Sequence, residues 1–157
     1  MRHSLTVIAI VLAGAALGGC EPTMHFPTDF VEVDKYDLGP YDQRAVSADG
    51  VVMALRSETN PKNASLDFWV TAIRNELIDR RGYALAKEKP IEGADGRKGN
   101  LMTFTAERSG VDFTYMVAVY VTVKTVLIAE TGGKHKTVAP RMPAFRKAFS
   151  SIRAGGV

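Results

Sequence analysis

The chain is short of cysteine and histidine, and this scarcity excludes several kinds of chemistry. Cys20 is the single cysteine among 157 residues, so no intramolecular disulfide can form and zinc sites built from several thiolates are excluded. None of the three histidines has a carboxylate or a second histidine at metal-ligand spacing, so we expect no metal site. A Ser-His-Asp site would have to use His25 or His135.

Motifs for nucleotides and activated nucleophiles are also missing. The Gly-x-Ser-x-Gly pattern does not occur. The segment 93–99 contains three glycines, but its spacing does not fit a phosphate-binding loop and a predicted strand follows it, which indicates a solvent-exposed connection. We therefore expect no cofactor. Glu130 is the one carboxylate inside an apolar run, where burial could raise its pKa; the alternative is a polar strand face or a salt bridge.

A long membrane-spanning run is absent too, although a shorter apolar run opens the chain. Leu5–Leu17 carries no charge but is shorter than the roughly 20 residues that a spanning helix needs. Arg2 before it and small residues after it are typical of a secretory signal peptide. The run closes with Leu17, Gly18, Gly19 and Cys20.

This ending resembles the lipobox of bacterial lipoproteins. The resemblance implies that Cys20 receives a diacylglyceryl group, with acyl chains such as palmitate, and becomes the mature N-terminus. Signal cleavage without lipid is the alternative. We expect a signal peptide over 1–19, a tether over 20–29, a domain over 30–153 and a frayed end over 154–157. The domain would face the periplasm or the cell exterior, and Glu21, in place of a retaining aspartate, favours the outer membrane.

Charge is mild overall but uneven along the chain. The formal net charge is +3, and Arg2 leaves with the signal, so nucleic acid is not an expected partner. Residues 21–45 are mainly acidic, whereas residues 132–157 carry basic groups and no acid. This asymmetry indicates either an interaction face or two ends that fold together. We regard the glycine-rich segment 132–136 as a candidate contact for an anionic partner, or else a linker; the candidate residues are Lys134, His135, Lys136 and Arg141.

Periodicity predicts strands and two helices. Asp49-Gly50 predicts a tight hairpin turn between strands 43–47 and 51–56. Ser65 is a good N-cap for an amphipathic helix that ends before Gly82. Alternation predicts a first strand from Phe30 and later strands over 83–89, 101–107, 111–121 and 125–131, and Pro143 favours the start of a closing helix.

The expected fold is α+β, a single twisted antiparallel sheet with two amphipathic helices packed on one face. Over residues 43–153 the order of elements resembles the family of the PsbP extrinsic subunit of photosystem II, whose fold small bacterial lipoproteins share. The matching features are Asp49-Gly50, Leu66–Gly82 with Tyr83, Tyr115–Val121 and the closing Phe145-x-x-x-Phe149-Ser150-Ser151-Ile152. The resemblance implies a non-catalytic accessory role and supplies no site residues.

Three functional hypotheses follow. The first is a non-enzymatic envelope lipoprotein, held to the membrane by lipid on Cys20, that binds an envelope protein or an anionic surface. The second is a carrier with a small-ligand pocket between sheet and helices, lined by Trp69, Tyr115 and Tyr120. The third is a hydrolase built around Glu130 or His135.

Overall fold

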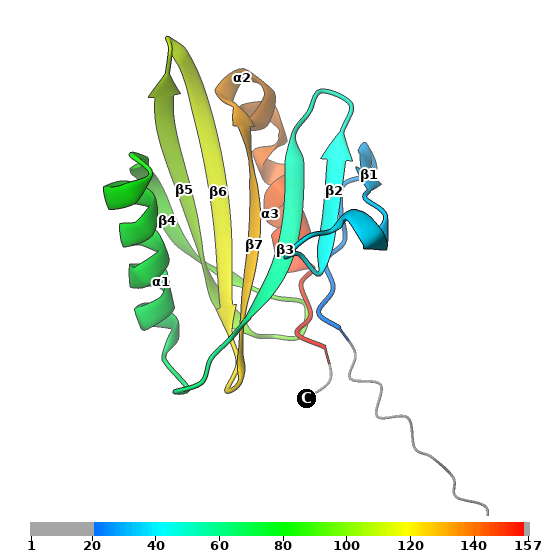
Figure 1. The fold of residues 1–157 in the computed structure, drawn as a ribbon, viewed down its shortest axis with the longest axis vertical. Helices are drawn as coiled ribbons and strands as arrows, with labels where there is room; N and C mark the ends of the chain where they lie inside the picture. Colours follow the sequence, from blue (N-terminus) through cyan, green and yellow to red (C-terminus); the bar gives the residue numbers. More distant parts are fainter. Residues whose placement is uncertain (1–20, 156–157) are drawn as a thin grey trace, which may run out of the picture.

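The computed structural model describes residues 21–155, which form one seven-stranded antiparallel sheet with helices on both sides (Figure 1). The strand order is β1-β2-β3-β7-β6-β5-β4. The elements in chain order are β1 (Phe30–Glu32), η1 (Lys35–Asp37), β2 (Gln43–Ser47), β3 (Val52–Thr59), α1 (Leu66–Asn75), η2 (Glu76–Arg80), β4 (Ala84–Glu92), β5 (Lys98–Arg108), β6 (Val111–Val121), β7 (Thr125–Lys134), α2 (His135–Val138), η3 (Ala139–Arg141) and α3 (Met142–Ser150).

Local signals place the turns and the first helix as the sequence predicts. Gly50 has a φ of 82°, in the left-handed region that favours glycine, and it lies in the turn that connects β2 to β3. The Ser65 side chain accepts a hydrogen bond of 3.2 Å from the Phe68 N–H and caps α1. Helix α1 continues into η2, a π-helical stretch, and ends where Gly82 takes a φ of 67°.

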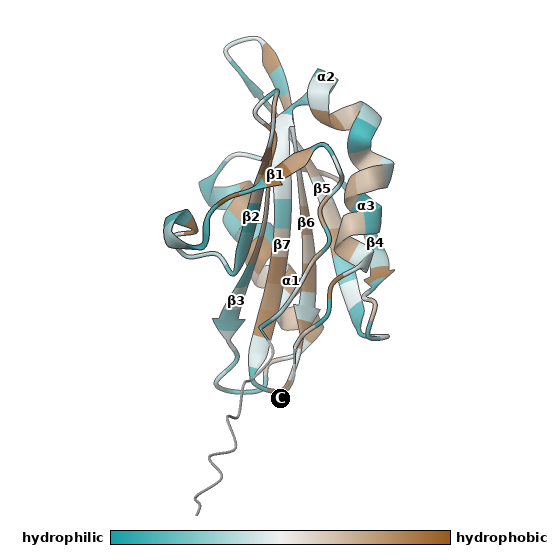
Figure 2. Cartoon of the chain, turned by 90° about the vertical axis from the view of Figure 1, so that its right-hand side faces the viewer, coloured by the Kyte–Doolittle hydropathy of each residue, from teal (hydrophilic) through white to brown (hydrophobic). Residues whose placement is uncertain are grey.

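The α+β class and the single antiparallel sheet are confirmed, but the helices pack on opposite faces, so their expected placement on one face is wrong. In β6, Val117 and Val119 join the core beneath α1, whereas Met116 and Ala118 join the core beneath α3. Figure 2 shows α3 along the right-hand side of the sheet. Both faces of β6 are therefore buried. The side chains that alternate with the valines, such as Ala118 and Thr114, are small or polar, but they are buried as fully as the valines.

The expected tether is wrong for the residues that precede β1. Met24 is only 2% exposed and belongs to the α3-side core. The Thr23 and Arg153 backbones exchange two hydrogen bonds of 3.0 Å, which pair the beginning of the described chain with its end. The domain thus begins at about Thr23, since this backbone pairing and the burial of Met24 fix the segment in place.

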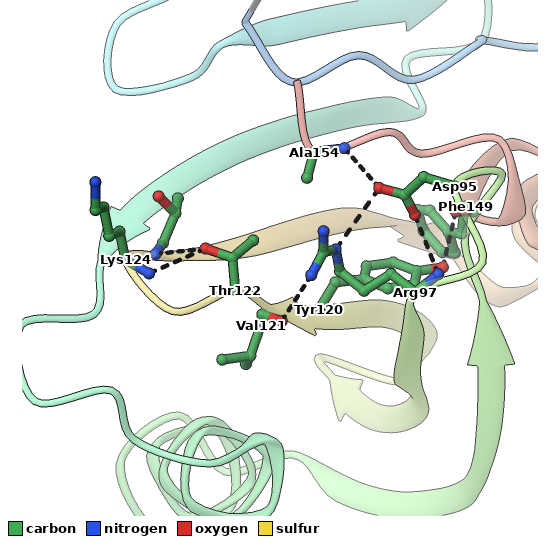
Figure 3. A network of polar contacts seen from close by, with 9 residues as sticks. Asp95, Arg97, Tyr120, Val121, Thr122, Lys124, Phe149 and Ala154 are labelled. Atoms are coloured by element: carbon green, nitrogen blue, oxygen red, sulfur yellow. Dashed lines mark hydrogen bonds and ion pairs between the residues drawn. The ribbon is translucent and has the colours of Figure 1, made fainter. Parts of the chain in front are cut away.

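The C-terminal segment is held by the turn between β4 and β5, so the expected fraying is wrong for Ala154 (Figure 3). The Asp95 carboxylate accepts a hydrogen bond of 3.1 Å from the Ala154 N–H and lies 3.6 Å from the Arg97 Nε. Burial raises the pKa of Asp95, but the hydrogen bonds from the Ala154 and Arg97 backbones and the Arg97 charge outweigh it and leave the pKa lowered. Beside them, the Tyr120 hydroxyl donates to the Phe149 carbonyl at 2.9 Å.

Four strands, β3, β4, β5 and β7, are longer than predicted, and two of them have a local explanation. β4 continues through Pro90, which is tolerated because β4 is an edge strand of the sheet. β7 continues through Gly132 and Gly133 instead of ending there. A Cβ on Gly132 would lie 2.7 Å from the Tyr115 ring, so the missing side chain makes room for that ring. Among residues 21–155, no helix is long and apolar enough to cross a membrane.

Candidate functional site

A groove runs along the α1 side of the sheet, where the helix stops covering the strands. Helix α1 packs on β5 and β6, and Val126 and Ile128 of β7 share the core beneath it, whereas Glu130 and Gly132 further along β7 lie outside that core. The hollow beside the helix has a volume of about 190 Å³. We call it the α1 groove; its lining includes Trp69, Ala72 and Ile73 from α1, Leu77 from η2, and Arg56, Tyr115, Val117, Ile128 and Glu130 from the sheet.

A second hollow of about 240 Å³ adjoins the α1 groove, and Tyr115 and Glu130 line both. We call it the tyrosine pocket; its lining includes Tyr41, Tyr83, Phe113, Tyr115, Glu130, Ala54 and Gly132. The rings of Tyr83 and Tyr115 lie 5.5 Å apart. Each hollow is smaller than the roughly 300–1,000 Å³ typical of a site for a drug-sized ligand, so a molecule of that size would need both.

Glu130 lies at the boundary of the two hollows, held by two phenols from distant parts of the chain. The Tyr41 hydroxyl donates to its Oε1 at 3.0 Å, and the Tyr115 hydroxyl donates to its Oε2 at 2.6 Å. Hydrogen bonds to a charged acceptor each contribute roughly 1.5–3 kcal/mol. A carboxylate has about four lone-pair positions, so two remain for donors from a bound molecule.

Burial and the carboxylate together keep both phenols protonated. Burial raises the pKa of Tyr115 most, and the charge of Glu130 and the hydrogen bond to it raise the pKa further. The same causes raise the pKa of Tyr41, while Arg56 and Arg44 oppose the rise. Both hydroxyls therefore stay hydrogen-bond donors at neutral pH, and the Glu130 carboxylate stays fixed between them.

Trp69, at the start of the groove, is also fixed by a polar contact. Its indole Nε1–H donates to the Asn60 Oδ1 at 3.1 Å, and the Asn60 amide donates to the Thr122 carbonyl at 3.0 Å. Asn60 is only 2% exposed. This contact ties the beginning of α1 to the β6–β7 turn, so the aromatic wall of the groove is rigidly placed.

The structure brings together two of the three residues expected to line a pocket. Trp69 and Tyr115 line the α1 groove, whereas Tyr120 is fully buried on the opposite face of β6, against α3. The expectation for Tyr120 is wrong because alternate residues of a strand point to opposite faces. Sequence analysis missed Tyr41, whose place beside Glu130 depends on a contact across 89 residues.

The candidate anionic contact is only partly assembled. Lys134, His135 and Lys136 are exposed at the junction of β7 and α2. Arg141 is instead engaged within the fold, 3.1 Å from Asp29 and 3.0 Å from Asp49, so two carboxylates already neutralise its charge. The oppositely charged chain ends thus do fold together.

The glycines of this segment are not an exposed loop either. Gly132 and Gly133 lie within β7, paired with β6, so this part of the segment 132–136 is a strand and not a linker.

The two residues suggested for a hydrolase do not meet in one site. The His135 Nδ1 lies 2.7 Å from the Thr114 Oγ1, and Thr114 alternates to the face opposite Tyr115. Glu130 faces the α1 side. Among residues 21–155, no group of three or more His, Cys, Asp and Glu side chains is placed to hold a metal ion. The lipobox residues Leu17, Gly18, Gly19 and Cys20 lie outside the described residues.

Comparison with known proteins supports the fold. Neither a protein-family model nor a curated protein matches this chain. Among solved structures, LpqN from Mycobacterium tuberculosis, described as involved in cell envelope biogenesis, is similar with a TM-score of 0.68 and 14% identity, over 85% of this chain and 84% of that one.

Two further structures share this fold. The cyanobacterial PsbP protein (CyanoP) from Synechocystis has a TM-score of 0.56 and 10% identity, over 90% of this chain and 95% of its own. A Pseudomonas aeruginosa protein of unknown function has a TM-score of 0.55 and 15% identity, over 88% of this chain and 86% of its own. The PsbP-like fold is confirmed, and at these identities the similarity concerns the fold alone.

Proposed function

We propose that this protein is a lipid-anchored component of the cell envelope, and that its domain is a non-catalytic binding module that uses the α1 groove and the tyrosine pocket. The signal-like start and the lipobox resemblance at Leu17–Cys20 support the anchor. The similarity in fold to LpqN, itself described as involved in cell envelope biogenesis, supports the location. We place the anchor in the outer membrane, because Glu21 stands where a retaining aspartate would be.

The observation that carries the binding role is the fixed carboxylate between two hollows. Both oxygens of Glu130 already accept phenol hydrogen bonds, at 3.0 and 2.6 Å, so the group is positioned to orient a ligand rather than to move a proton. Beside it, Trp69 and Ile73 offer an apolar wall. The ligand that fits is an extended envelope molecule with hydrogen-bond donors for Glu130 and an apolar part for the helix side.

The anchor and the groove are tested separately. Mass spectrometry of the natural chain should show acyl chains on Cys20, and a Cys20→Ser chain should lose membrane attachment. A natural chain that starts at another residue, or carries no lipid, contradicts the anchor.

For the groove, we would replace Ala72, which lines it, with tryptophan, and compare the neighbouring Thr71→Trp, which adds the same ring outside the groove lining. Both positions are exposed, so neither variant disturbs the core. Tagged proteins are purified from native membranes, and mass spectrometry identifies the small molecules that co-purify.

We expect a compound that accompanies wild type and Thr71→Trp, is lost with Ala72→Trp, and is reduced with Glu130→Gln. Retention of the same compounds by Ala72→Trp contradicts the groove as the binding site.

A further inference from the structure

The N-terminal end of the described residues is fixed against the fold, and this limits the distance between the domain and a lipid on Cys20. Thr23 is paired with Arg153 by two backbone hydrogen bonds of 3.0 Å, and Met24 is buried. Glu21 and Pro22 alone separate Cys20 from that pairing. Three residues span at most about 11 Å when fully extended. An anchor on Cys20 therefore holds one particular end of the domain close to the bilayer.

That end is formed by both terminal segments together with two turns. In Figures 1 and 2 the N- and C-terminal segments, the β3–α1 loop and the β6–β7 turn all lie at the lower end of the molecule. The two turns are joined directly, since the Asn60 N–H donates to the Lys124 carbonyl at 2.7 Å. Their position relative to the anchor is therefore fixed by the core and not by a linker.

The side chains of the two turns suit a bilayer surface. Val123, in the β6–β7 turn, is 67% exposed, and Phe68, in the first turn of α1, is 58% exposed. Lys62 and Lys124 are exposed in the two turns, neither of which contains an acidic residue. A lysine near an anionic membrane surface contributes roughly 1 kcal/mol, and exposed apolar side chains can enter the headgroup region.

We propose that this end of the domain docks on the bilayer, with the β6–β7 turn (Thr122–Lys124) and the β3–α1 loop (Asn60–Ala64) in contact with anionic phospholipid headgroups. The inference rests on the proposed lipid anchor at Cys20. The docking also sets the distance between the binding site and the membrane surface. Glu130 is five residues along β7 from Thr125, which corresponds to about 17 Å at roughly 3.4 Å per residue. Glu130 and the tyrosine pocket therefore lie away from the docked end, whereas Trp69, which donates to Asn60, lies at that end.

The test places one fluorescent label at a time on the full lipidated chain. A mature chain with acylated Cys20 has no free thiol, so Val123→Cys, Lys62→Cys or Glu107→Cys supplies a unique attachment site. Glu107 is an exposed residue near the β5–β6 turn, at the other end of the strands, and serves as the control. Each labelled protein is reconstituted into phosphatidylethanolamine–phosphatidylglycerol vesicles that carry a headgroup quencher.

We expect strong loss of fluorescence at positions 123 and 62 and little at position 107, with the loss at position 123 reduced by Lys62→Glu and Lys124→Glu. A protein that floats with the vesicles but shows equal quenching at all positions overturns the docking and leaves the anchor intact. Protection of position 123 in native membranes without quenching in pure vesicles indicates a protein partner instead and also overturns it. A chain without acyl mass on Cys20 overturns both the anchor and the docking.

Discussion

Replacement of Met24 by alanine should destabilise the domain strongly, although the lack of periodicity around this residue predicts a tether. The side chain is 2% exposed and packs in the α3-side core, and its backbone N–H donates to the Gln43 side chain. Removal of a buried methionine side chain costs about 2–5 kcal/mol, from lost apolar transfer and from the cavity left behind. For a domain of this size each kcal/mol lowers Tm by about 4 °C.

The measurement is urea unfolding of a Cys20→Ser chain, followed by circular dichroism, with the same chain carrying Met24→Ala or His25→Ala. His25 is the matched control because its side chain is exposed, whereas the side chain of the adjacent Met24 is buried. We expect the His25→Ala curve to coincide with that of the parent. A loss below about 0.5 kcal/mol for Met24→Ala, the range of ordinary surface substitutions, would refute the assignment of this segment to the core.

Three further outcomes follow from particular contacts. Tyr120→Phe should lower stability at neutral pH by about 1–3 kcal/mol, because a buried carbonyl loses its donor. Burial raises the pKa of Tyr120, so its stabilisation is present below about pH 10 and lost above it; urea titrations should show a shallower alkaline decline in the variant. Arg141→Met should lower Tm at neutral pH; the Ser47 hydrogen bond and the Arg141 charge lower the pKa of Asp49, so the difference should shrink as the pH falls and the Asp49 carboxylate takes up a proton. Gly99→Ala should cost about 1–3 kcal/mol in urea unfolding, because a Cβ there would lie 2.6 Å from a backbone carbonyl oxygen of β6.

The features predicted correctly are those that short-range interactions decide. A positive φ at Gly50 and the side-chain cap by Ser65 depend only on neighbouring residues, so their signals are readable in the sequence. The side of the sheet on which a helix packs is different. Both faces of β6 carry buried side chains, and the alternation of apolar residues alone does not show which face receives α1 and which receives α3.

The candidate site was predictable in part for the same reason. Glu130 can be singled out from the sequence because it interrupts an apolar run, but its hydrogen-bond partners come from elsewhere in the chain. Tyr41 lies 89 residues away and Tyr115 on the neighbouring strand, and neither contact has a local signal. Met24 joins the core through packing against residues far along the chain, which equally leaves no periodic pattern in a segment with two prolines.

The composition of β7 nevertheless indicates where the groove must open. On its α3 side the strand presents Leu127, Ala129 and Thr131, all buried. On its α1 side it presents Ile128, then Glu130 and Gly132, and only the first of these lies in the core beneath the helix. A charged residue followed by a glycine on one face of a strand whose other face is buried marks the point where the covering helix ends. Because that face is left without a helix, the Tyr115 ring can pack over Gly132 and reach the Glu130 carboxylate, which joins the two hollows into one site.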